Sequence, residues 1–140
     1  MSDMLFIIGG VALAAIIFYA LYEAYRKQNN EEPSSVSDLV NNMADEQLVV
    51  DHLEPKELTS WFRTKNADNS KKNVLIYPNL CDMNSFKLPE NIELDADNII
   101  IQALLDKNDN IFLCRSVIFS DISEKLQQIF KDNDGVIIVE

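Results

Sequence analysis

The chain contains one histidine, His52, and two cysteines, Cys81 and Cys114. A cysteine and a histidine that meet in a fold can act as nucleophile and base. His52 lies in the sequence Asp51-His52-Leu53-Glu54, which is typical of a surface residue or a helix end. No helix N-terminus is evident after Cys81 that would lower the pKa of its thiol. We therefore expect no catalytic pair. Two cysteines are what a reducing compartment tolerates as buried apolar residues, so we expect both thiols to stay reduced; in an exported domain the same pair would form a single disulfide.

Metal and cofactor sites are not indicated. Two cysteines and one histidine leave a tetrahedral zinc site incomplete, and their spacing matches no ligand pattern. Residues 106–110, DKNDN, resemble the start of a calcium loop, but Ile111 stands where glycine is needed and Val117 where a bidentate glutamate is needed. Asp and Asn are also the residues that a hairpin turn requires. We expect a turn there, no metal and no cofactor.

Three residues are candidates for contact with a partner: Trp61, Phe62 and Arg115. Aromatic side chains supply much of the energy at protein interfaces, and Trp61 and Phe62 fall together on an expected helix. The sequence favours the alternative that both lie in the core. Arg115 interrupts an apolar strand, so it must lie at an edge, on a wet face or beside an acid. A solvent-facing position is favoured over a ligand contact.

The N-terminal segment from Met4 to Tyr22 carries no charge over nineteen residues. As a helix it would reach about 28 Å, close to the ~30 Å apolar thickness of a bilayer. The residues before it contain Asp3 and no basic residue, which excludes a cleaved signal peptide. The pattern predicts a single transmembrane helix over about residues 4–25.

The flanking charges predict an orientation for this helix. Arg26 and Lys27 follow the apolar run, and basic residues are retained on the cytoplasmic side. We therefore expect the N-terminus outside and the C-terminal domain in the cytoplasm. Gly10 and Ala14 form a small-residue step that lets a second helix approach, so a homodimer through this helix is a further expectation.

The balance of charges limits the classes of partner. The formal net charge of the chain is −11. Binding to nucleic acid depends on basic residues that neutralise phosphates, so we expect no nucleic-acid partner.

The rest of the pattern predicts an α+β fold in three parts: an anchor over 1–27, a linker over 28–35 and a cytoplasmic domain over 36–140. The domain should begin with two helices, one over 36–53 and one from Pro55. A strand over 74–77 should precede a β-hairpin of 99–105 and 111–119, a helix over 121–131 and a strand over 136–139. A right-handed crossover would place this last strand parallel to the second hairpin strand, giving a small mixed sheet.

These features favour a binding protein over an enzyme. We expect a single-pass membrane protein whose acidic domain is an interaction module that recruits or scaffolds a protein partner. A small accessory subunit of a larger membrane complex, held by its transmembrane helix, is the first alternative. An enzyme with an unrecognised site is the second.

Overall fold

The computed structural model describes residues 10–82, 92–93, 95 and 98–139 of the chain. These residues form a five-stranded sheet with the order β1-β4-β3-β2-β5. The strands are β1 (Glu46–Leu53), β2 (Lys72–Ile76), β3 (Ile99–Leu105), β4 (Ile111–Ile122) and β5 (Val136–Val139). The helices are α1 (Gly10–Asn29), α2 (Val36–Met43), α3 (Pro55–Lys65) and α4 (Glu124–Asp132), with a short 3₁₀ helix, η1 (Pro78–Leu80). The α+β class and the mixed sheet are confirmed.

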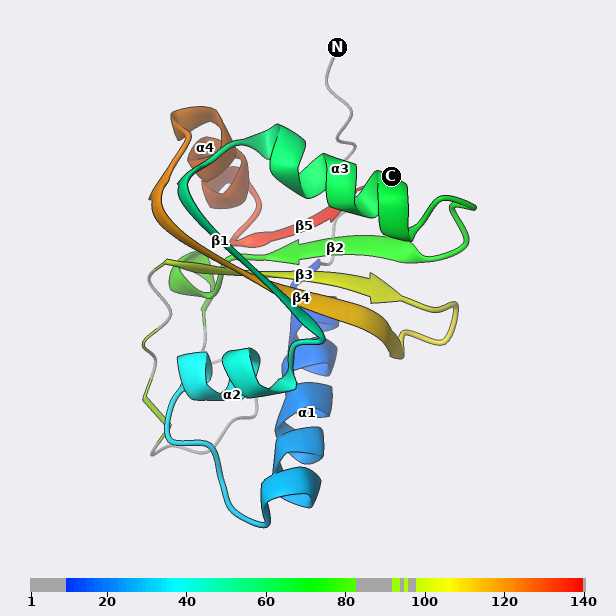
Figure 1. Ribbon diagram of the computed structural model, residues 1–140, viewed down its shortest axis with the longest axis vertical. Helices are drawn as coiled ribbons and strands as arrows, with labels where there is room; N and C mark the ends of the chain where they lie inside the picture. Colours follow the sequence, from blue (N-terminus) through cyan, green and yellow to red (C-terminus); the bar gives the residue numbers. More distant parts are fainter. Residues whose placement is uncertain (1–9, 83–91, 94, 96–97, 140) are drawn as a thin grey trace.

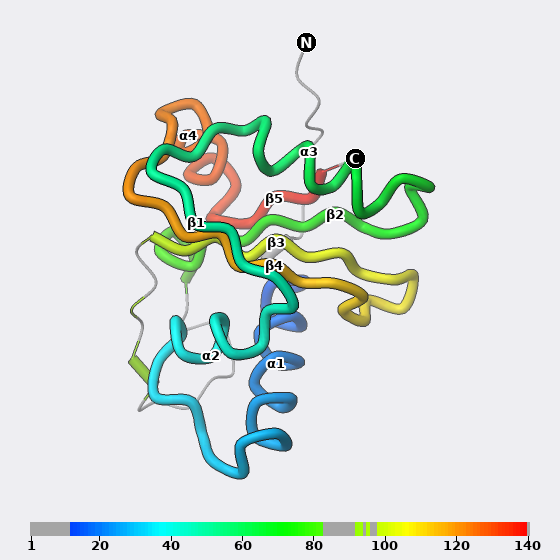
Figure 2. Tube along the Cα trace, viewed as in Figure 1, coloured from blue at the N-terminus to red at the C-terminus, as the bar shows by residue number. Residues whose placement is uncertain are grey.

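The helices cover both faces of the sheet. Figure 1 shows α3 and α4 on one side of the strands and α1 with α2 on the other, and the trace in Figure 2 shows the same three layers. Each face has its own hydrophobic cluster. The central strand β3 contributes to both clusters and is buried along all of its length. Burial on both faces explains why its sequence, IIIQALL, is almost continuously apolar.

Helix α1 packs on the sheet through one face. Its buried residues recur at helical spacing: Ala14, Ile17, Phe18, Leu21, Tyr22 and Tyr25. The last of these donates a hydrogen bond from its hydroxyl to Asp38 Oδ2 at 2.9 Å, which joins α1 to α2. The opposite face exposes Ile16 and Tyr19. An apolar segment without a polar stripe thus covers the sheet with one of its faces.

The expected transmembrane span, residues 4–25, lies partly outside the described residues. Within the described part, none of the helices combines the length and apolar composition that crossing a bilayer requires. The transmembrane helix therefore has no support from the described structure.

The prediction of one helix over 36–53 is wrong in its second half. Helix α2 ends at Met43, and residues 46–53 form β1, which pairs in parallel with β4. Leu48 and Val50 pack against the cluster under α3, whereas Val49 is exposed on the opposite side. This alternation has the two-residue period of a strand, and β-branched residues such as Val49 and Val50 favour strands. Pairing with β4, which lies far along the chain, makes these residues a strand and not a helix.

The predicted hairpin-helix-strand unit is confirmed, but the direction of its last strand is wrong. The hairpin consists of β3 and β4, and it is followed by α4 and β5. Strand β5 pairs antiparallel with β2, not parallel with β4. Both edges of β4 are already occupied, by β3 and β1, so β5 adds at the far edge of the sheet.

Local polar groups fix the ends of these elements. The Asp106 carboxylate accepts hydrogen bonds from the backbone of Asn108 and Asn110, which closes the expected turn. Helix α4 is capped by Ser123 and not by a residue at 121, because β4 continues to Ile122. After α4, Gly135 adopts φ +84°, and a Cβ there would lie 2.9 Å from a backbone oxygen, so only glycine fits.

Burial of α4 yields a stability prediction. Leu126 is fully buried in the cluster between α4 and the sheet. Leu126→Ala should lower the free energy of unfolding of the full chain by about 2–5 kcal/mol, because it leaves a cavity. Lys125→Ala, at an exposed position on the same helix, should change it by no more than about 0.5 kcal/mol. Equal urea midpoints for the two variants would contradict this packing.

Candidate functional site

Arg115 lies inside the protein and not on a wet face of the sheet. Its residue is 8% exposed, and its guanidinium donates to Gln102 Oε1 from Nε at 3.1 Å and from Nη2 at 2.7 Å. Nη2 also reaches the Glu57 carbonyl oxygen at 3.2 Å. Gln102 in turn donates to the Leu58 carbonyl at 2.6 Å. The favoured solvent-facing position is thus corrected: Arg115 ties β3 and β4 to the underside of α3.

Trp61 and Phe62 are both buried, at 6% and 4% exposure. Their rings meet edge to face, with centroids 5.7 Å apart, and the Arg115 guanidinium lies 5.1 Å from the centre of the Trp61 ring. The indole Nε1 donates to Glu46 Oε1 at 3.2 Å, which lowers the pKa of Glu46. Neither ring is on the surface, so the favoured interpretation of Trp61 and Phe62 as core residues agrees with this geometry.

The cluster around Arg115 joins β3, β4 and α3. Burial lowers the pKa of Arg115, and the negative charges of Glu46 and Glu57 oppose that effect. The guanidinium bonds are accepted by two neutral groups, the fully buried Gln102 amide and the Glu57 carbonyl. A buried charge with such partners positions α3 over the sheet, and its hydrogen bonds are used within the chain.

The Arg115 cluster yields a second stability prediction. Arg115→Met keeps most of the apolar stem but leaves Gln102 Oε1 without its donor, which should cost about 1–3 kcal/mol of unfolding free energy. Replacing Gln102 by Met as well should cost less than the sum of the single changes, because the two groups share one interaction. Arg63→Met, at an exposed position of α3, serves as the control. If the losses of unfolding free energy of the two single variants add up in the double variant, as measured by denaturant unfolding, this interpretation is wrong.

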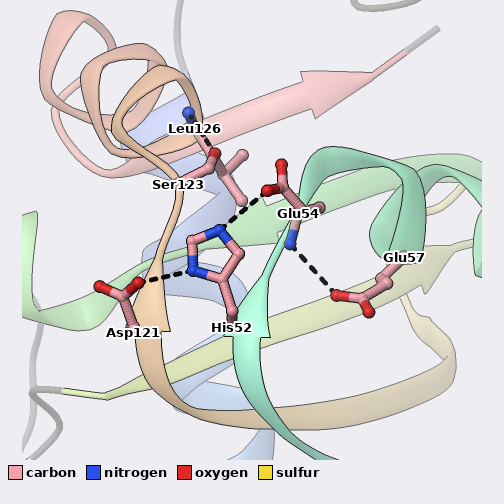
Figure 3. Close-up of polar contacts among 6 residues, drawn as sticks. All are labelled: His52, Glu54, Glu57, Asp121, Ser123 and Leu126. Carbon is pink, nitrogen blue, oxygen red and sulfur yellow. Dashed lines mark hydrogen bonds and ion pairs between the residues drawn. The ribbon is translucent and has the colours of Figure 1, made fainter.

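His52 lies at the surface, between two carboxylates. Figure 3 shows its ring at the end of β1, with Nδ1 2.5 Å from Asp121 Oδ2 and Nε2 2.8 Å from Glu54 Oε1. The hydrogen bond to Asp121, and then that to Glu54, raise the pKa of His52. Glu54 and Glu57 form the capping box of α3. The imidazole therefore links the ends of β1 and β4 to the start of α3.

His52 and Cys81 do not form a nucleophile-base pair. Cys81 follows η1 after β2, and two strands separate β2 from β1, which corresponds to about 14 Å. The Cys81 thiol instead donates to the Tyr77 carbonyl at 3.3 Å. Burial raises the pKa of Cys81 and of Cys114 to about 12, so neither is a thiolate near neutral pH. Among the described residues no group of His, Cys, Asp and Glu could hold a metal ion.

Because the chain has one histidine, the effect of pH on stability near neutral pH can be assigned to His52. Because the pKa of His52 is raised in the fold, its interactions stabilise the protein fully below the ordinary pKa of about 6.5 and are lost as the pH rises through the folded pKa. His52→Asn should therefore destabilise the chain more at pH 6 than at pH 8.5, as measured by urea unfolding.

A titration followed by NMR gives an independent check of this site. The imidazole resonance should report a pKa above the ordinary value, and Asp121→Asn should bring it down because the strongest hydrogen bond is lost. A wild-type pKa at or below the ordinary value would contradict the geometry in Figure 3.

The outer face of α1 changes character along the helix. In its first half it exposes Ile16 at 44% and Tyr19 at 55%. In its second half Arg26 lies 3.6 Å from Glu23 and stacks over Tyr22. Ala14, one member of the expected Gly10–Ala14 packing step, is fully buried in the protein's own core. The exposed apolar surface of α1 is therefore not the face that the small residues mark.

Comparison with known proteins finds one similarity. Residues 1–67 match the family model of the Chordopoxvirus A13L protein. The match covers 67 of the 140 residues, just under half, and contains α1, α2, β1 and α3. The matching part is not a separate fold, since β1 pairs with β4 from the other half. No curated protein and no solved structure matched the chain.

Proposed function

We propose that this chain is a membrane-associated protein that acts by binding another protein and not by catalysis. The observation that carries the first part is the uncharged run from Met4 to Tyr22, together with the apolar outer face of α1 at Ile16 and Tyr19. Large apolar side chains that the described residues leave uncovered favour lipid or a partner. The similarity to a chordopoxvirus protein covers this same segment and supports a membrane-associated viral role.

The arrangement of charge on α1 suits a bilayer surface. Its apolar first half leads to Arg26 and Lys27, which are positioned to meet headgroups while the half before them enters apolar lipid. In the finer form of the proposal the helix spans the membrane once, with the N-terminus outside and residues 36–140 in the cytoplasm. The buried face of α1 would then exchange its contacts with the sheet for lipid.

The binding role is inferred from what the polar clusters are used for. The guanidinium of Arg115 is hydrogen-bonded within the fold, the imidazole of His52 is held by two carboxylates, and both thiols have a raised pKa. These groups support the fold, and a nucleophile with an adjacent base is not among them. An acidic domain held at a membrane raises the local concentration of whatever it binds.

An accessory subunit of a larger membrane complex is the alternative, and purification separates the two roles. After extraction in mild detergent, a subunit should co-purify with other membrane proteins in a fixed proportion. A recruiting module should purify alone and bind its partner reversibly when the partner is added.

Membrane association can be tested on the outer face of α1. The full chain should float with liposomes of mixed neutral and anionic lipid, and Ile16→Glu combined with Tyr19→Glu should reduce the bound fraction at least tenfold, because charges in apolar lipid are costly. Ala24→Glu, with Ile16 and Tyr19 intact, is the matched control at an exposed position and should still float.

Two results would contradict the membrane proposal. One is a wild-type chain that stays with the soluble protein after flotation. The other is a folded double variant that floats as well as the control.

A further inference from the structure

The sheet face under α1 is apolar and depends on this helix for its cover. Its fully buried side chains come from β2, β3 and α2: Val74, Ile76, Ile101, Ala103, Leu105, Leu39 and Val40. Helix α1 lies over this face (Figure 1) and contacts β5 and α2. Without α1 a continuous apolar surface would meet water, and such surfaces mark interaction sites. A cover is therefore needed in every state of the protein.

Most of the attachment of α1 is of a kind that lipid can replace. Its buried stripe, from Ala14 to Tyr25, is largely apolar, and apolar contacts are not directional. Two tyrosines in the second half of the helix add hydrogen bonds, from the Tyr22 hydroxyl to Glu32 Oε1 at 2.8 Å and from the Tyr25 hydroxyl to Asp38 Oδ2 at 2.9 Å. The apolar contacts of the first half are ones that hydrocarbon tails offer as well.

The connection after α1 allows the helix to move without disturbing the sheet. Asn30, at φ +53°, follows the end of the helix, and residues 30–32 are exposed. The five described strands pair with one another and not with α1. Residues 30–35, which join α1 to α2, span at most about 20 Å when extended. A bilayer that holds α1 therefore keeps the uncovered face close to its surface.

We infer that the face under α1 is the surface that binds the partner, and that α1 covers it until the helix enters a bilayer. The inference rests on the proposed membrane association and partner binding. Lipid and the sheet compete for one stripe of α1, so the helix cannot serve both at once. Membrane binding opens the partner site, and in solution the site is closed.

The kind of partner follows from what α1 leaves behind. The vacated surface fits a helix with apolar residues at the spacing of Ala14, Phe18 and Leu21. At one end the Asp38 carboxylate loses the hydroxyl donor of Tyr25. A hydroxyl or basic residue of the incoming helix can replace that donor, and the net charge of −11 favours a basic one. The fitting partner is a membrane-bound protein with such a helix next to the bilayer.

A second copy of the chain fits this surface less well. At the same membrane the α1 helix of the second copy has entered lipid too, so it is not free to act as the cover. Packing two uncovered faces together would instead bring together two chains that each carry a formal net charge of −11. Charge repulsion of this size opposes association.

Thiol labelling tests whether α1 leaves the sheet. Val136 and Ile137 are buried neighbours on β5, but Val136 belongs to the cluster under α1 and Ile137 to the cluster under α3 and α4. With the full chain on liposomes, N-ethylmaleimide should label Val136→Cys at least tenfold faster than in solution. Ile137→Cys is the matched control and should be labelled slowly in both. Mass spectrometry of the labelled peptides separates these thiols from Cys81 and Cys114.

The outcomes separate this inference from the proposed function. A chain that floats with liposomes while Val136→Cys stays protected binds lipid through the outer face of α1 alone, which overturns the inference and leaves the membrane association standing. A chain that does not float contradicts the membrane association, and the inference falls with it. Equal acceleration at Val136→Cys and Ile137→Cys indicates unfolding of the whole domain on lipid and also overturns the inference.

A peptide tests the partner site. The probe is residues 10–29 with Ala12→Gln, Ile16→Gln and Tyr19→Gln, which make the exposed face polar and keep the buried stripe. After subtraction of binding to bare liposomes, it should bind the liposome-bound chain at least tenfold more tightly than the chain in solution, where α1 competes from within the molecule. Phe18→Gln in the same peptide should weaken binding at least tenfold. Equal binding of the two peptides, or equal binding to the two forms of the chain, would overturn the partner site.

Discussion

Strand β3 is buried on both faces of the sheet, and the rest of the structure follows from the need to cover those faces. Its seven residues contribute to two hydrophobic clusters, so apolar helices must lie above and below it. Helices α3 and α4 cover one side, and α1 supplies most of the cover on the other (Figure 1). Fully burying side chains such as Ile17 and Phe18 contributes about 1.5–3 kcal/mol each.

This constraint uses only one side of α1. One stripe of the helix is needed by the sheet, and the apolar residues of the opposite stripe remain uncovered by the described chain. Both a membrane span and a helix that covers a sheet can have an uncharged apolar run such as residues 4–22. A free-standing span and a covering helix therefore have nearly the same sequence pattern, and only the contacts of Phe18 and Tyr25 distinguish them.

The elements that the sequence predicted are those fixed by nearby residues. The turn at Asp106, the proline at the start of α3 and the glycine after α4 each act within a few positions, so the hairpin and these helix ends could be inferred. Strand β1 could not, because its partner β4 lies 69 residues further along the chain. The direction of β5 was missed for the same reason: it depends on β3 and β1 having already occupied both sides of β4.

For the polar sites too, contacts between residues far apart in the sequence could not be predicted. That Arg115 needed a partner was clear from its apolar neighbours, but Gln102 became that partner only through the register of β3 with β4. Likewise, no local signal links His52 to Asp121, since these two residues meet only where β1 and β4 end together. The burial of Trp61 could be predicted because Leu58 and Phe62 share its face of one helix.

The pairing of β1 with β4 also sets the timing of folding during synthesis. Glu46 leaves the ribosome 69 residues before its register partner Arg115, an interval of roughly 3–14 s at ordinary rates of translation. Throughout that time the sheet that α1 covers is incomplete, and the inner stripe of the helix has α2 but not the strands to pack against. The nascent N-terminal half is thus available to a bilayer or a chaperone before the second half emerges and competes for it.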